Sequence, residues 1–392
     1  MKINLKKSKK IFVLVGEESG DIIASDLIHE IKIQNRDKFD LKFYGVTGPR
    51  MKSHGVITIF DFTEINYLGV SEIILNFFLL KIKLNKLIKK IKIINPDVLI
   101  TVDAKLFSLS LAKGLKKKNV SNNIKLVHVV LPTIWAHSPS RAYKWKKVFD
   151  LLVSIIPNED KYFTNYDVKT IYLGNPIFEK FLNKVTTLKY LKNKKDTTCL
   201  ILPGSRENEI KYNIDVLLKT VLKINYHYKN KIKWLLPTLD RFQKTIQHKI
   251  KFYNLQHAIE IVNFDKSFKK IAESKVAICC SGTATLQLSL LSIPTIVIYK
   301  TSFLNAILGK LFVNIDNVVL PNFISGKKVL PHLFQEKCTT ENLFKLFCEF
   351  YDNYKVHKNK FQKLSNDLKK EIIQNKNGFN YNLTKTIFNI LS

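Results

Sequence analysis

Hydrophobic residues along the chain form short runs that alternate with helical patterns. Five runs in the first half are apolar at nearly every position: IFVLVG, KFYGV, VLITVDA, IKLVHVVLP and LLVSIIP. Such runs are typical of parallel strands with helices on both faces of the sheet. The second half repeats the scheme with TCLILPGS, IKWLLPTL, IEIVNF, VAICCSG and TIVIYK. We therefore expect two open α/β sheets in tandem, with a cleft for ligands.

The segment 178–198, FEKFLNKVTTLKYLKNKKDTT, shows no strand pattern and ends in a charged run. It is the expected connection between the two domains. This predicts an N-terminal domain at 1–180 and a C-terminal domain at 181–392, with a last helix that could pack back on the first domain. The length of 392 residues agrees with two domains.

Residues that follow the apolar runs are candidates for the site, because ligands of open parallel sheets bind at the carboxyl ends of strands. The loop GEESGD after the first run matches neither of the two common nucleotide-loop patterns. The other candidate segments are 103, 132–135, 203–206 and 281–285.

Two of these segments could hold a phosphate. Gly204, Ser205 and Arg206 combine a turn, the start of a helix and a guanidinium. Ser281, Gly282 and Thr283 offer small residues and backbone N–H groups where a strand meets a helix. An ordinary turn with a surface arginine, and simple helix capping, are the respective alternatives.

Asp103 ends a buried strand, where a carboxylate can serve as a general base or cap the next helix. Trp135, His137 and Arg141 follow another strand and could line the same cleft. A lone histidine in such a place is more often structural than catalytic.

Lysine and arginine number 64 against 32 acidic residues, a formal net charge of +32. Such a charge favours anionic partners, although the lysines are spread along the chain as in an A- and T-rich gene. Nucleic acid ranks last among these partners because no known binding module is present.

The five cysteines show neither a C-x-x-C motif nor paired metal-ligand spacing, which indicates reduced thiols, a cytoplasmic setting and no metal site. The apolar stretch behind the basic N-terminus is too short for a signal peptide, and no run approaches the length of a membrane span. However, 68–92 joins an apolar block to a lysine-rich one. It is either a sheet-packed helix or a surface for an anionic membrane.

The order of the blocks GEESGD, GVTGPRM, VDA, LPTIWA, LGNP, LPGSR, SGTATL and LPN resembles the lipid-A-disaccharide synthase family from about residue 11 to about 335. LPGSR and SGTATL match the family motifs outright, and GEESGD is similar to the family's GEASGD. The resemblance implies a GT-B type fold with two Rossmann-like domains and a cleft between them. It also implies an inverting hexosyltransferase that joins UDP-2,3-diacylglucosamine to 2,3-diacylglucosamine 1-phosphate without a cofactor, on the inner face of the cytoplasmic membrane.

Residue roles follow from the same resemblance. Asp103 would be the base, and Arg206 would stabilise the departing diphosphate. The remaining residues expected at the sugar nucleotide are Gly204, Ser205, Ser281, Gly282, Thr283, Gln287 and Asn322. Those expected on the acceptor side are Ser19, Gly20, Asp21, Trp135 and Arg141.

This chain departs from the family motifs at several positions. Gln287 stands where the family has Glu, Leu106 replaces the second acid of DAPDF, and Asn175 replaces a histidine. His332 stands where the family has an acid, and SPSVWAWR is LPTIWAHS here. Because of these changes, two alternative functions stay open. The chain could be another UDP-sugar enzyme with a different acceptor, or a non-catalytic paralogue at the membrane surface. The sequence leaves the oligomeric state open, with a homodimer among the alternatives.

Overall fold

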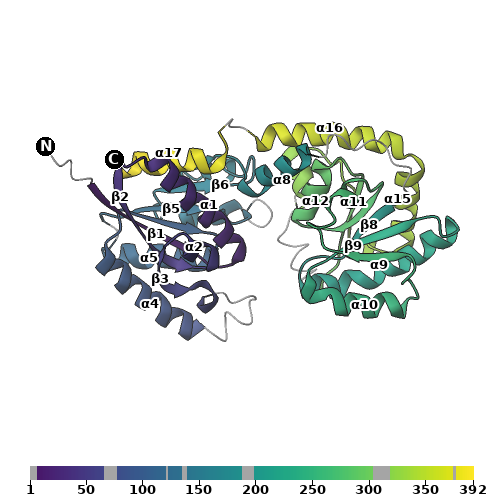
Figure 1. The fold of residues 1–392 in the computed structure, drawn as a ribbon, viewed down its shortest axis with the longest axis horizontal. Coiled ribbons are helices and arrows are strands. Elements are labelled where there is room, and N and C mark those ends of the chain that lie inside the picture. Colours follow the sequence, from purple (N-terminus) through teal and green to yellow (C-terminus); the bar gives the residue numbers. More distant parts are fainter. Residues whose placement is uncertain are drawn as a thin grey trace. The chain divides into compact units, whose positions relative to one another are not determined.

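The computed structural model describes residues 7–65, 77–120, 122–134, 139–187, 198–302, 318–373 and 377–392. The chain divides into two compact units (Figure 1). The first comprises most of the chain up to Glu179 together with Ile372–Ser392, and the second comprises Lys180–Glu371. The end of the chain therefore returns to the first unit.

The first unit contains a parallel sheet in the order β3-β2-β1-β4-β5-β6-β7. Its strands are β1 (Lys7–Val15), β2 (Phe39–Thr47), β3 (Ile57–Asp61), β4 (Val98–Val102), β5 (Lys125–Val129), β6 (Leu151–Ser154) and β7 (Thr170–Tyr172). The five strands expected from the first-half runs are confirmed. The pattern missed β3 and β7 because they lie at the edges and are short and partly exposed.

Helices cover both faces of this sheet. They are α1 (Glu18–Asn35), α2 (Pro49–Ser53), α4 (Phe77–Ile94), α5 (Lys105–Lys117), α7 (Lys161–Thr164) and α17 (Phe379–Leu391), with 3₁₀ turns η1 (Phe62–Glu64) and η2 (Pro139–Trp145). Helix α8 (Pro176–Thr186) includes the point at which the chain passes from the first unit to the second. Ile11, Val13 and Val15 of β1 pack in one core with α1 and α17, while Phe12 and Leu14 pack in the other with α4 and α5. Both faces of β1 are buried, which explains its unbroken apolar run.

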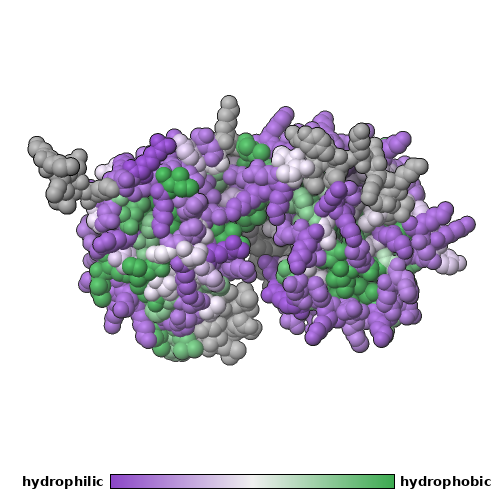
Figure 2. Space-filling model, viewed as in Figure 1, coloured by the Kyte–Doolittle hydropathy of each residue, from purple (hydrophilic) through white to green (hydrophobic). Residues whose placement is uncertain are grey.

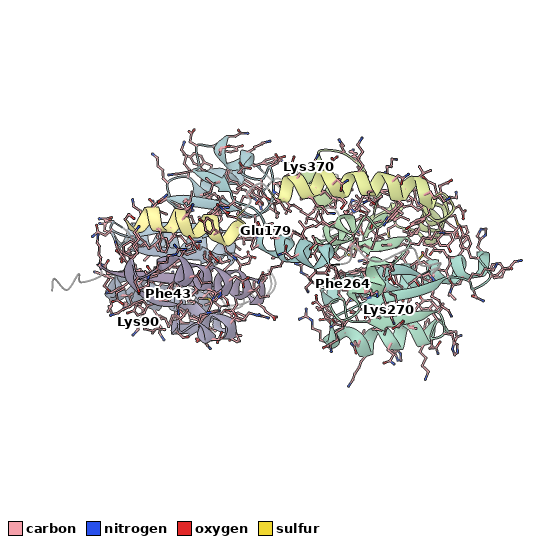
Figure 3. The ribbon with its side chains drawn as sticks, turned by 45° about the horizontal axis from the view of Figure 1, so that its top comes forward. Phe43, Lys90, Glu179, Phe264, Lys270 and Lys370 are labelled. Atoms are coloured by element: carbon pink, nitrogen blue, oxygen red, sulfur yellow. The ribbon has the colours of Figure 1, made fainter. Side chains whose placement is uncertain are left out.

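Helix α17 is anchored to the first unit at its start. Both carboxylate oxygens of Glu179, a residue labelled in Figure 3, accept hydrogen bonds from the N–H of Phe379, at 3.1 and 3.0 Å. The Tyr172 hydroxyl donates to the carbonyl of Ile372 at 3.1 Å. These contacts hold together the two places where the chain passes between the units.

The second unit contains a parallel sheet in the order β10-β9-β8-β11-β12-β13. Its strands are β8 (Thr198–Leu202), β9 (Lys233–Pro237), β10 (Ile259–Val262), β11 (Ala277–Cys280), β12 (Thr295–Tyr299) and β13 (His332–Phe334). The helices are α9 (Glu207–His227), α10 (Gln243–Phe252), α11 (Phe268–Ala272), α12 (Thr283–Leu290), α14 (Leu320–Ser325), α15 (Thr340–Asp352) and α16 (Tyr354–Ile372), with 3₁₀ turns η3 (Asp240–Phe242) and η4 (Gln335–Lys337). The five strands expected from the second-half runs are confirmed, and β13, a half-buried edge strand, was missed.

Helix α4 contains the lysine-rich part of the segment 68–92. Leu87 and Ile91 are buried in the core, whereas Lys86, Lys89 and Lys90 are exposed, so this part is a sheet-packed helix with a basic outer face. Residues 68–76 and the side chain of Phe77 lie outside the described residues. Within the described parts of the chain, no helix is long and apolar enough to cross a membrane.

Candidate active site

The strand order reverses once in each sheet. In the first unit the chain leaves β1 toward β2 on one side and later enters β4 on the other. In the second unit β8 and β11 occupy the equivalent positions. Ligands of open α/β sheets bind at such switch points, beyond the carboxyl ends of the two strands. The loops after β1, β4, β8 and β11 begin the segments 16–21, 103, 203–206 and 281–285 that sequence patterns singled out.

Asp103 directly follows β4 and is held in a tight turn. Asp103 and Ala104 both adopt left-handed backbone conformations, with φ of 56° and 46°. The N–H of Asp103 donates to the carbonyl of Val129 at 2.9 Å, and its own carbonyl accepts from the Ser108 hydroxyl at 2.9 Å. Two consecutive left-handed residues without glycine are strained, and such strain gathers at functional sites.

Burial raises the pKa of Asp103 to about 6. The Lys105 ammonium, whose Nζ lies 3.6 Å from Oδ1 of Asp103, lowers this pKa, while the Glu17 carboxylate raises it. Glu17 in turn accepts a 2.5 Å hydrogen bond from the Ser19 hydroxyl. A carboxylate with this pKa is suited to take a proton near neutral pH.

Glu17 and Lys105 were not among the predicted site residues. A Cβ added to Gly16 would lie only 2.5 Å from the Cβ of Ala104, so the loops after β1 and β4 touch. Glu17 reaches Asp103 because of this approach. The sequence showed the acidic turn but not that it meets the turn after β4.

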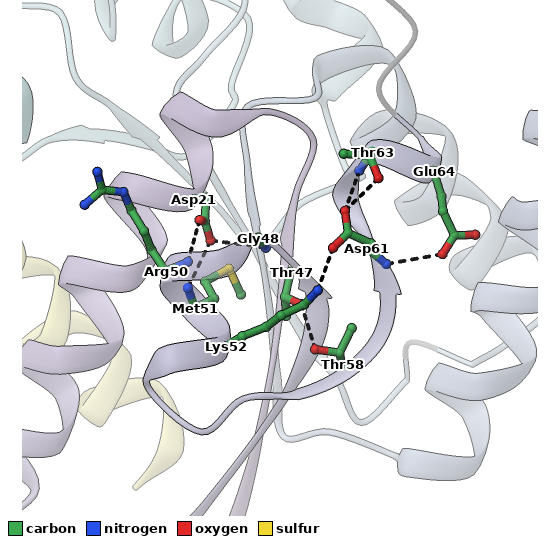
Figure 4. Close-up of polar contacts among 10 residues, drawn as sticks. All are labelled: Asp21, Thr47, Gly48, Arg50, Met51, Lys52, Thr58, Asp61, Thr63 and Glu64. Carbon is green, nitrogen blue, oxygen red and sulfur yellow. Dashed lines mark hydrogen bonds and ion pairs between the residues drawn. The ribbon is translucent and has the colours of Figure 1, made fainter.

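Asp21 anchors the neighbouring helix α2. Its carboxylate is 1% exposed and accepts hydrogen bonds from the N–H groups of Gly48, Arg50 and Met51, at 3.2, 2.9 and 3.1 Å (Figure 4). A side chain at Gly48 would collide with this carboxylate. Asp21 therefore joins the GEESGD and GVTGPRM blocks and does not offer its carboxylate to a ligand.

The other acceptor-side candidates differ in their placement. Gly20 is buried against Val102 and Val15, which lets α1 approach the sheet closely. Arg141 is exposed in η2. Trp135 and His137 lie outside the described residues.

A buried histidine that the patterns did not single out lies on β5. Nδ1 of His128 lies 2.7 Å from Oγ1 of Thr101, and its ring packs against Trp145 and Phe149. Burial, with a smaller effect of the Lys105 charge, lowers the pKa of His128 to about 3. His128 is therefore a neutral core residue at neutral pH.

The start of α9 carries its own anion. The Glu209 carboxylate accepts hydrogen bonds from the N–H groups of Ser205 and Arg206, at 2.8 and 3.2 Å, and from Nη1 of Arg206 at 2.8 Å. Gly204, with φ of 124°, leaves room for Glu209, because a Cβ there would lie 2.4 Å from that of Glu209. The expectation that the Ser205 and Arg206 N–H groups would cradle a phosphate is therefore wrong.

The Arg206 side chain nevertheless lies near the second loop. It is 81% exposed, and its charge lowers the pKa of both Tyr299 and Cys280, although burial raises both overall. These two residues end β12 and β11. Glu209 was missed, but it matches a capping-box glutamate three residues after the helix start.

Among the described residues, the start of α12 is open. Ser281 donates its N–H to the carbonyl of Ile298, whereas a Cβ added to Gly282 would meet no described atom within 4 Å, and both Gly282 and Thr283 are exposed. The first N–H groups of a helix have no acceptor within it, so this end attracts an anion. Half-buried Gln287 lies one turn further along the same face as Thr283.

Asn322 holds a turn. Its Oδ1 accepts hydrogen bonds from the N–H groups of Val329 and Leu330, and its Nδ2 donates to the carbonyl of Leu330. The side chain is buried, and its amide is committed to this turn. It shapes the loop after α14.

The chain matches the family model described as "Lipid-A-disaccharide synthetase" over residues 11–391. A "Lipid-A-disaccharide synthase" of Wigglesworthia glossinidia brevipalpis is 32% identical over 373 residues, covering 93% of this chain and 94% of that protein. One of Rickettsia bellii (strain OSU 85-389) is 30% identical over 338 residues, with 84% and 85% coverage.

Two solved structures share the fold. A UDP-GlcNAc 2-epimerase from Neisseria meningitidis has a TM-score of 0.61 at 12% identity, covering 97% of this chain and 99% of that one. The glycotransferase of kitacinnamycin has a TM-score of 0.60 at 10% identity, covering 98% and 99%. With the two α/β units described above, these likenesses confirm the expected GT-B type fold.

Replacing Asp103 by Asn should remove turnover but stabilise the protein. Burial of the ionised carboxylate costs up to about 3 kcal/mol of folding free energy. Because the pKa is higher in the folded than in the unfolded chain, this cost is complete above about pH 6 and fades as the pH falls toward 3.8. Urea unfolding should show a gain for Asp103→Asn at pH 8 that shrinks at pH 4.5. An equal gain at both pH values would contradict the raised pKa of Asp103.

Replacing Glu209 by Gln should destabilise the second unit by about 1–3 kcal/mol, because two backbone N–H groups lose a charged acceptor. Glu207→Gln is the matched control, because it removes the same charge from the same helix start at an exposed position. Urea unfolding of both variants measures the difference. Equal stability of the two variants would show that the Glu209 contacts contribute little.

Proposed function

The chain belongs to the lipid-A-disaccharide synthetase family, and we propose that it joins UDP-2,3-diacylglucosamine to 2,3-diacylglucosamine 1-phosphate. It is a glycosyltransferase of lipid A disaccharide synthesis. The products of the proposed reaction are the disaccharide 1-phosphate and UDP, with inversion at the anomeric carbon. The observation that carries this proposal is the half-buried Asp103 at the switch point, with a pKa of about 6.

Asp103 acts as the general base. Its carboxylate takes the proton of the acceptor hydroxyl as the hydroxyl oxygen bonds to the anomeric carbon and the bond to UDP breaks. A single displacement of this kind inverts the anomeric centre. General-base catalysis typically contributes about 10²–10⁴-fold. Glu17 and the strained turn at residues 103–104 hold the carboxylate in place.

The second unit holds the donor. The open start of α12, at Gly282 and Thr283, supplies backbone N–H groups for the diphosphate, and the exposed Arg206 supplies a positive charge. Negative charge that develops on a leaving group is stabilised most by donors that are already held in position. The hydrogen bond from Nη1 of Arg206 to Glu209 holds the guanidinium in position. In this proposal Gln287 contacts the sugar nucleotide. Asn322 supports the loop after α14.

The acceptor binds at the carboxyl edge of the first sheet. Ser19 lies beside Glu17, while Gly20 and Asp21 keep that loop in shape. Trp135 and Arg141 complete the acceptor side in this proposal.

Purified protein should convert the two acylated substrates into a disaccharide and UDP. Mass spectrometry measures the disaccharide, and a UDP assay measures the second product.

Arg206→Ala should lower kcat/KM by about 10²–10³-fold and weaken UDP binding, because the negative charge that develops on the diphosphate loses a stabilising partner. Chelator should change little. UDP binding without a disaccharide would favour a non-catalytic paralogue, and turnover with another acceptor would favour a divergent UDP-sugar enzyme.

We also propose that the protein binds the inner face of the cytoplasmic membrane peripherally through the start of α4. Phe78, Leu79 and Ile82 are 77%, 51% and 50% exposed there. Helix α4 ends just before β4 begins, so its start lies at the carboxyl edge of the sheet, where Asp103 also lies. Figure 2 shows hydrophobic surface at this end of α4. Substrates with two acyl chains could enter from the bilayer at this edge.

Replacing Phe78, Leu79 and Ile82 together by Ser should reduce sedimentation with anionic vesicles, because the apolar contact is lost. The matched control replaces Ile33, Ile57 and Ile93 by Ser, three exposed residues at the opposite edge of the same sheet. High salt should weaken binding of the parent only partly. Equal vesicle binding by the two triple variants would refute the proposal.

A further inference from the structure

We propose that Lys105 and Asp103 together form a subsite for a sugar phosphate, in which the Lys105 ammonium binds the phosphate of the acceptor while Asp103 contacts its hydroxyl. The inference rests on the proposed function. It adds a residue and a ligand group that the family motif does not supply, since DAKLF stands here in place of DAPDF.

The turn after β4 fixes Lys105 at the site. Lys105 is the first residue of α5 and directly follows the two left-handed residues Asp103 and Ala104. Its Nζ lies 3.6 Å from Oδ1 of Asp103, beyond the usual hydrogen-bond range. For comparison, the ion pair of Lys9 with Asp97 has a separation of 2.8 Å. Lys105 therefore adds positive charge beside Asp103 without a close bond to it.

The charge of Lys105 is directed toward the site. The side chain is about one-third exposed, and its charge acts on buried His128 as well as on Asp103. A positive charge in the first turn of a helix is unfavourable to that helix. Lys105 thus has no evident role in stabilising α5, although Lys116 and Lys117 occupy the favourable last turn.

The chemistry of the acceptor requires such a cation. Glu17 and Asp103 place two carboxylates at this position, and they would repel an acceptor that carries a phosphate. An ammonium 3.6 Å away offsets this repulsion. A ligand can contact both Asp103 and Lys105 if its hydroxyl and phosphate oxygens lie within about 9 Å. A single hexose ring that carries both groups meets this condition.

The surroundings also fit an acylated sugar. Leu106, the next residue of α5, is 69% exposed. An apolar side chain beside the ammonium suits a ligand that presents a phosphate next to an acyl chain. The simpler alternative is that Lys105 only lowers the pKa of Asp103, and the experiment separates the two.

The test compares two acceptors, 2,3-diacylglucosamine 1-phosphate and the same sugar without its phosphate, in detergent micelles. For Lys105→Met, kcat/KM with the phosphorylated acceptor should fall by about 10- to 100-fold, mainly through KM. Both assays are run at pH 8, above the pKa of Asp103, because removing the Lys105 charge also raises that pKa. With the dephosphorylated acceptor, kcat/KM at this pH should change less than threefold. Lys105→Arg should retain most activity. Lys113→Met, an exposed lysine of the same helix, is the control and should behave as the parent.

Equal losses with both acceptors, together with a shifted pH profile, would show that Lys105 only tunes Asp103 and would overturn the subsite. Binding to anionic vesicles should be unchanged in Lys105→Met, because the proposed phosphate belongs to the acceptor and not to the bilayer. If the parent forms no disaccharide, the proposed function fails separately. Equilibrium binding of the two sugars then decides, and a phosphate-dependent affinity that Lys105→Met does not reduce would overturn the subsite.

Discussion

The reversal of strand order beside the first strand of each sheet is the constraint on which the site depends. A parallel sheet brings all its carboxyl ends to one edge, and the reversal leaves two adjacent loops there that diverge to opposite faces. In the first unit these loops carry Glu17 and Asp103, and in the second they carry Arg206 and Gly282. The runs of β1 and β8 are apolar because helices cover both faces of each sheet. The helices cover the faces of the sheets and not the carboxyl ends of the strands, so the loops at these ends remain accessible.

The two units use this arrangement in opposite ways. In the first unit, the two loops are in contact at Gly16 and Ala104. Burial there raises the pKa of Asp103. In the second, Glu209 occupies the start of α9 and leaves the start of α12 open. In the proposed reaction, the first unit therefore supplies the proton acceptor and the second unit supplies the anion site. Base catalysis on a hydroxyl and stabilisation of a departing diphosphate require these two properties.

The sequence predicted ten of the strands because most of their positions are apolar and buried, and nine of these ten are central strands of their sheets. It missed β3, β7 and β13, where edge position and partial exposure weaken the pattern. Motif order predicted which loops carry the chemistry, but not which atoms remain available. Whether an N–H group is already bonded depends on which side chain reaches it. The contact of Glu209 with Ser205 is local and agrees with the capping-box spacing, whereas Asp21 and Met51 lie 30 residues apart, and no local pattern predicts their contact.

Two departures from the family motifs, Asn175 and the pair Lys105–Leu106, differ in their surroundings, which bears on whether the chain is an active enzyme. Asn175 is buried and structural: its Oδ1 accepts hydrogen bonds from the N–H groups of Ile177 and Phe178, and its Nδ2 donates to the carbonyl of Ile155. An asparagine can therefore cap α8 without touching the chemistry. Lys105, by contrast, forms an ion pair with Asp103, and Leu106 is the next residue of the same helix. A chain that had lost catalysis would have no reason to keep a strained, destabilising carboxylate there, since its burial opposes folding. The retention of Asp103 next to altered neighbours therefore argues for a changed acceptor contact rather than for an abandoned active site.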